Sequence, residues 1–132
     1  MEEADYLDTL MALSQDLDDV TPAVLALAAQ AVQAHPRSTK LRCLMGNLIQ
    51  LGPPDAWYGL AEAQQCYAAA LAIDPACWEA YQELGYFHFV VRDDPASAAA
   101  AFQAAIALGA GPDAYEGLAR AQAELDAPGN RS

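Results

Sequence analysis

The two histidines, His35 and His88, are the side chains best suited by type to acid–base chemistry at neutral pH. A serine or cysteine hydrolase would also need a nucleophile near such a base, as in a glycine-flanked elbow. Neither histidine lies beside a serine or cysteine of that kind, and no glycine-rich phosphate loop is present in the sequence. We therefore predict that the chain is not an enzyme. His88 falls at an inward position of a strongly patterned helix, so we expect a core histidine with a hydrogen-bond partner.

Metal chemistry is equally poorly supported by the spacing of possible ligands. The three cysteines, Cys43, Cys66 and Cys77, lack the paired spacing of a zinc site and are an odd number for a disulfide framework. We expect Cys43 and Cys66 to be buried apolar residues. The acidic segment 16–19 resembles the start of a calcium loop but lacks the loop glycine and the distal glutamate. The sequence therefore predicts no metal and no cofactor.

The charge of the chain restricts its partners. Eighteen acidic residues against six basic ones give a net charge of −12, which repels phosphates, so we expect neither nucleic acid nor membrane as a partner. A basic protein or peptide would be attracted. No apolar run approaches the roughly 20 residues that span a bilayer, and the acidic start is unlike a secretory signal. We expect a cytoplasmic protein, and the preference for arginine and alanine indicates a GC-rich, bacterial genome.

The positions of apolar and capping residues predict an all-α chain of about seven helices. Thr21, Ser38 and Asp94 are suitable N-caps, and Pro22 and Pro95 stand at first helical positions. The resulting helices cover residues 4–17, 22–34, 38–50, 60–73, 75–91, 95–108 and 112–125.

Pairs of a large and a small residue recur along these helices about every 34 residues. They are Met11-Ala12, Met45-Gly46, Leu84-Gly85 and Leu118-Ala119. In the clearest repeat, Tyr81 precedes Leu84-Gly85 and the next helix carries Ala98, Phe102 and Ala105. The repeat before it has Met45, Gly46, Ala63, Tyr67, Ala70 and Pro75. At these residues the sequence resembles the tetratricopeptide-repeat family. The first repeat matches less well, because Ala28 stands where the family has a large aromatic residue.

The resemblance implies a right-handed superhelical solenoid of antiparallel helix pairs. Three repeats, about 4–36, 38–75 and 76–111, would be followed by a capping helix at 112–125. We expect a single domain over residues 1–127 and a disordered tail at 128–132.

The resemblance also implies a concave groove that binds a protein or peptide and is lined by the first helix of each repeat. Carried over by position, the groove residues are Lys40, Asn47, Glu79, Gln82, Tyr86, Phe89, Asp113, Glu116 and Arg120. Trp57 and Tyr58 lie in an insertion and would form either a structural lid or an aromatic anchor for a partner.

Two functions fit this sequence. The first is a non-catalytic protein–protein interaction module, a scaffold that binds a segment in the groove. The alternative is a dedicated acidic immunity protein or secretion chaperone that neutralises one basic toxin or effector. The oligomeric state stays open.

Overall fold

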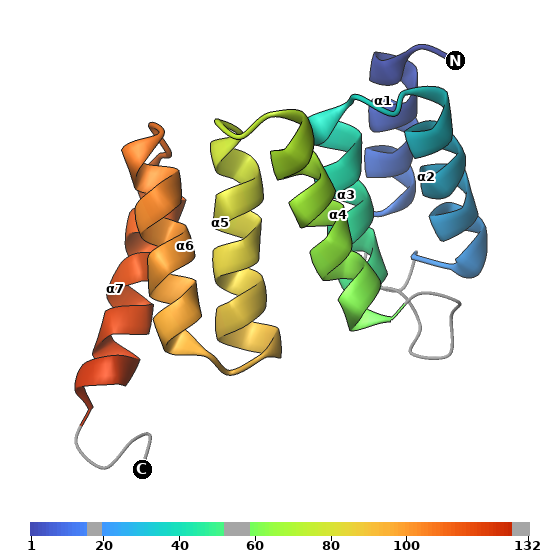
Figure 1. Cartoon of the computed structure of the whole chain (residues 1–132). Coiled ribbons are helices and arrows are strands. Elements are labelled where there is room, and N and C mark those ends of the chain that lie inside the picture. Colours follow the sequence, from blue (N-terminus) through green and yellow to red (C-terminus); the bar gives the residue numbers. More distant parts are fainter. Residues whose placement is uncertain (16–19, 52–58, 128–132) are drawn as a thin grey trace. The chain divides into compact units, whose positions relative to one another are not determined.

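The computed structural model describes residues 1–15, 20–51 and 59–127, and the regular secondary structure of these residues is helical, without strands (Figure 1). The all-α prediction is confirmed. The helices are α1 (Glu3–Leu13), α2 (Pro22–Ala34), α3 (Thr39–Leu51), α4 (Leu60–Ile73), α5 (Trp78–Tyr86), the π-helical segment η2 (Phe87–Val91), α6 (Pro95–Ala107) and α7 (Pro112–Asp126).

The chain divides into two compact units. The N-terminal unit, Met1–Pro75, contains α1 to α4, and the C-terminal unit, Ala76–Ser132, contains α5 to α7 with η2. Within the first, α3 packs on both α2 and α4; within the second, α6 packs on both α5 and α7 (Figure 1). The boundary between the units coincides with the predicted boundary between the second and third repeats.

The three helix starts predicted from capping residues, at Thr21, Ser38 and Asp94, are confirmed by their hydrogen bonds. The hydroxyl of Thr21 accepts from the Val24 amide at 3.4 Å, and that of Ser38 accepts from the Leu41 amide at 3.1 Å. The Asp94 carboxylate accepts from the Ser97 amide at 3.1 Å. Hydrogen bonds from the side chain and from the backbone of Ser97 lower the pKa of Asp94. Each cap satisfies an amide that has no partner within the helix, so local chemistry determines where these helices begin.

The first helix is shorter than predicted, ending at Leu13 rather than near residue 17. The Ser14 hydroxyl donates to the Leu10 carbonyl at 2.7 Å, and the Ser14 amide donates to the same oxygen at 3.1 Å. Such local bonding by serine competes with continuation of the helix. Within this helix Tyr6 and Leu10 are buried, whereas Met11, the large residue of the first large–small pair, is 61% exposed.

The predicted single helix at 75–91 begins at Trp78 and changes to π-helical geometry after Tyr86. The Arg92 amide donates to the Phe87 carbonyl, five residues back, at 3.2 Å, and Asp93 has a positive φ of 51°. Since a π turn holds an extra residue, it shifts which side chains face inward. Phe87 is buried and His88 only half-buried, so the prediction of a core histidine is wrong.

The core of each unit contains an aromatic ring seated against a glycine of another helix. An added Cβ at Gly46 would lie 2.8 Å from the Tyr67 ring, and one at Gly85 would lie 2.6 Å from the Phe102 ring. An added Cβ at Gly117, on α7, would clash with the Phe102 ring in the same way. Both rings are fully buried. The helices therefore approach closely because these positions lack a side chain.

Substituting Gly85→Ala should lower the free energy of unfolding by about 1–2 kcal/mol. Alanine is favoured over glycine in a helix by about 1 kcal/mol, but overpacking of a filled core costs about 1–3 kcal/mol, and the upper part of that range applies to a ring that is enclosed on all sides. The Phe102 ring has no exposed surface toward which it can move. Chemical denaturation would measure the effect, with Gly111→Ala as the control because nothing lies within 4 Å of an added Cβ there. Because Gly111 is the N-cap of α7, its alanine variant loses some stability through capping. A Gly85→Ala protein as stable as the wild type would contradict the steric account.

Candidate functional site

Tyr86 is the centre of a candidate interaction surface on α5 and α7 of the C-terminal unit. Its ring packs edge-on against Phe102, with centroids 4.8 Å apart and an interplanar angle of 78°. Its hydroxyl donates to the backbone carbonyl of Asp113 at 2.7 Å. These two contacts attach Tyr86 both to the core and to the start of α7. The ring is consequently held in one orientation, with part of it facing solvent.

Four charged side chains lie close enough to the Tyr86 hydroxyl to shift its pKa. Burial is the main cause that raises the pKa of Tyr86 above its ordinary value of 10.0, and the charges of Glu116, Asp113 and Glu83 raise it further. Arg120 acts in the opposite direction. Three carboxylates against one guanidinium leave this area negative, which favours the approach of a cation. We call Glu83, Tyr86, Asp113, Glu116 and Arg120 the acidic–aromatic surface.

The structure brings together four residues of the predicted groove: Tyr86, Asp113, Glu116 and Arg120. Three further predicted residues lie along the same segment: Glu79 is exposed, Gln82 is half-buried, and Phe89 packs against the core of the unit. Glu83 was missed as a member of the surface. Its position one helical turn before Tyr86 is the signal that could have identified it.

Tyr86→Phe should lower the free energy of unfolding by about 0.5–1 kcal/mol at neutral pH, through loss of the bond to Asp113. Because the folded pKa lies above the unfolded one, Tyr86 stabilises fully below pH 10.0, and this stabilisation is lost as pH rises through the folded pKa. The variant should therefore lose less stability than the wild type in alkali. Urea denaturation at pH 8 and pH 11 would measure this, with Tyr115→Phe, at a 57% exposed position, as control. An equal loss of stability between pH 8 and pH 11 in the wild type and in Tyr86→Phe would contradict the role assigned to the Tyr86 hydroxyl.

The other two predicted groove residues, Lys40 and Asn47, lie on α3 of the N-terminal unit. Lys40 is exposed. Asn47 is half-buried, and its side-chain oxygen accepts from the Tyr67 hydroxyl at 2.5 Å, while the Gln50 amide donates to that same hydroxyl at 2.7 Å. Asn47 therefore holds the buried Tyr67 in place, and the acidic–aromatic surface does not include these two residues.

Tyr67→Phe should lower the free energy of unfolding by about 1–2 kcal/mol, because Asn47 and Gln50 then lose a partner in a partly buried setting. Asn47→Ala should cost less, since the hydroxyl keeps its bond from Gln50. Thermal or chemical denaturation would measure which of the two variants loses more stability. A larger loss for Asn47→Ala than for Tyr67→Phe would show that Asn47 stabilises the unit in some other way.

Several predicted residues cannot be compared with the structure. Trp57 and Tyr58, the alternative lid or anchor, and the predicted tail 128–132 lie outside the described residues, as does the acidic segment 16–19. The choice between lid and anchor therefore stays a prediction.

His35 makes two local contacts, and two of the three cysteines can be compared with the predicted burial. His35 Nε2 lies 2.9 Å from the Met1 carbonyl oxygen, and its ring packs edge-on against Tyr6 at 5.7 Å. Cys43 is buried as predicted, whereas Cys66 is half-buried.

Among the described residues, no three histidines, cysteines or carboxylates come together as metal ligands. None of the helices described is long and apolar enough to cross a membrane.

Comparison with known proteins does not identify a family. No protein-family model matches the chain, and no curated protein gives a significant match. The resemblance to tetratricopeptide repeats therefore depends on the residues described above.

Proposed function

We propose that the chain is a non-catalytic protein-interaction module of the tetratricopeptide-repeat type, and that its acidic–aromatic surface binds a basic segment of another protein. The observation that carries the proposal is that three carboxylates and one guanidinium lie close enough to the Tyr86 hydroxyl to shift its pKa. The proposed repeats would stack as a solenoid, as in that family, within a cytoplasmic bacterial protein. The Gly46–Tyr67 and Gly85–Phe102 contacts support this assignment, because they join the residues that the repeat pattern pairs.

The chemistry of the surface suits a lysine or arginine side chain. A cation close to the solvent-facing part of the Tyr86 ring would gain cation–π attraction, about 0.5–1 kcal/mol at an exposed site. Glu83 and Glu116 would supply ion pairs, which are weak individually in water and depend on several charges acting together. Binding should therefore be sensitive to salt, since the screening length is about 10 Å at 0.1 M salt.

The dedicated neutraliser of one basic toxin or effector is the second candidate. The excess of acidic over basic residues in both halves of the sequence favours it, because a large basic partner could then be attracted by the whole chain. The two functions differ in the number of partners. A neutraliser has one tight partner, whereas an interaction module binds several related segments.

The test of this function compares two variants that lose the same charge. Glu83→Gln with Glu116→Gln changes the surface, and Asp8→Asn with Asp126→Asn is the control at two exposed carboxylates elsewhere. We expect the wild type and the control to retain basic proteins from a lysate of the source organism at 50 mM salt, and the surface variant to retain about tenfold less. Washing at about 1 M salt should release them. Mass spectrometry would identify the retained proteins.

Equal retention by the surface variant and the control would refute the acidic–aromatic surface as the binding site. One basic protein retained in stoichiometric amount would favour the neutraliser, and several would favour the interaction module. Tyr86→Ala is not a suitable test variant, because Tyr86 also packs on Phe102 and bonds to Asp113, so its loss would weaken the fold.

A further inference from the structure

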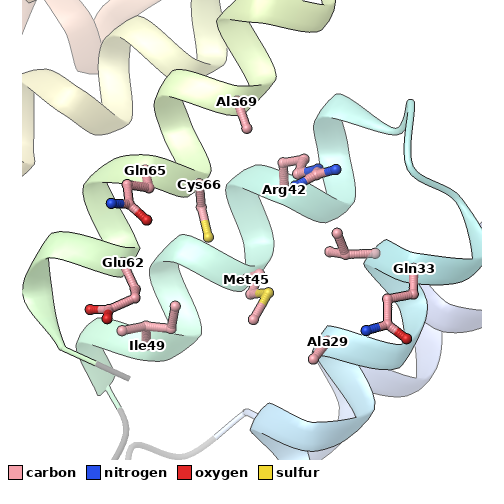
Figure 2. Close-up of a pocket in the computed structure, with 10 residues that line it drawn as sticks. Ala29, Gln33, Arg42, Met45, Ile49, Glu62, Gln65, Cys66 and Ala69 are labelled. Atoms are coloured by element: carbon pink, nitrogen blue, oxygen red, sulfur yellow. The ribbon is translucent and has the colours of Figure 1, made fainter. Parts of the chain in front are cut away.

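A pocket of about 460 Å³ lies between α2, α3 and α4 of the N-terminal unit (Figure 2). This volume is within the usual range of sites for small ligands, about 300–1,000 Å³. Val32, Met45 and Ile49 supply much of its apolar wall, and alanines of α2 and α4 leave the space open. The pocket can therefore hold an apolar group of several carbon atoms. It is separate from the acidic–aromatic surface, which belongs to the C-terminal unit.

The polar residue that distinguishes this pocket is Arg42 of α3. Its Nη2 donates to the Pro36 carbonyl at 3.2 Å, a long bond at an exposed place. Its Nε is buried and has no hydrogen-bond partner among the described residues. A buried donor of a charged group without an acceptor is costly. A small movement of the guanidinium into the pocket, at the expense of the Pro36 bond, would offer Nε and a terminal nitrogen together to a carboxylate.

Neither Cys66 nor Glu62, the two titratable side chains that line the pocket beside Arg42, supplies that acceptor. Burial raises the pKa of the Cys66 thiol above its ordinary value of 9.0, although the Arg42 charge lowers it, so the sulfur stays protonated near neutral pH. Glu62 accepts from the Gly59 amide at 2.8 Å at the start of α4. In Figure 2, Glu62 and Arg42 lie on opposite sides of the pocket.

We propose that this pocket binds a small monocarboxylate with an apolar chain, such as a medium-chain fatty acid. The carboxylate accepts from Arg42, and the chain lies against Val32, Met45 and Ile49. A single negative charge fits best, because the net charge of −12 repels anions in proportion to their charge.

The experiment titrates the full chain with octanoate and, separately, with octan-1-ol, following binding by calorimetry and by NMR shifts of the methyl groups of Val32, Met45 and Ile49. Arg42→Gln removes the proposed carboxylate partner, and Lys40→Gln removes the same charge from an exposed position of the same helix. Octanoate should bind the wild type and Lys40→Gln in a saturable manner, and Arg42→Gln about tenfold or more weakly. Octan-1-ol should not distinguish the three proteins.

Two results would overturn the proposal: octanoate that binds Arg42→Gln as tightly as the wild type, or no saturable binding to the wild type. Circular dichroism would show whether Arg42→Gln is folded. If it is not, Ala69→Phe fills the pocket from a half-buried position on α4. That variant should abolish octanoate binding while remaining helical, and unchanged binding would likewise refute the site.

Discussion

Close contact between an aromatic ring and a glycine on a neighbouring helix is the constraint on which each unit depends. Tyr67 of α4 lies against Gly46 of α3, and Phe102 of α6 lies against both Gly85 of α5 and Gly117 of α7. Alanines on either side of each ring are fully buried, so the helix carrying the ring can approach its neighbour without leaving a void. A chain rich in alanine obtains its core volume from these few rings. The pair α1–α2 has Ala28 in place of a ring and uses Tyr6, Leu10 and Leu25 instead.

The hydroxyl ends of two tyrosines connect this packing to the surface. The Tyr67 hydroxyl bonds to Asn47 and Gln50, and the Tyr86 hydroxyl bonds to the Asp113 carbonyl. Asn47 and Tyr86, two positions of the predicted groove, are therefore engaged in hydrogen bonds that hold an aromatic ring in place. In the proposed function, the charged side chains close to Tyr86 select the partner, and their negative balance favours a basic one.

Local signals in the sequence were sufficient for most helix boundaries and for the partners of the rings. The caps at Thr21, Ser38 and Asp94 act within a few residues, and repeat spacing aligns Gly85 with Phe102. Features that depend on contacts between helices were missed. The π-helical turn that buries Phe87 in place of His88, and the second glycine contact at Gly117, both follow from packing around α6. Of the candidate site, Tyr86, Asp113, Glu116 and Arg120 were found by position, whereas Glu83 and the structural use of Asn47 were not.

The most direct measurement of the central claim is a nuclear Overhauser spectrum of the wild-type protein. The account predicts strong cross-peaks from the Hα protons of Gly85 and Gly117 to the ring protons of Phe102, and from those of Gly46 to the ring of Tyr67, because the rings lie against these glycines. Such cross-peaks arise only between protons a few ångströms apart and require no substitution that could itself disturb the fold. Their absence, in a protein that circular dichroism shows to be helical, would contradict the proposed basis of the packing.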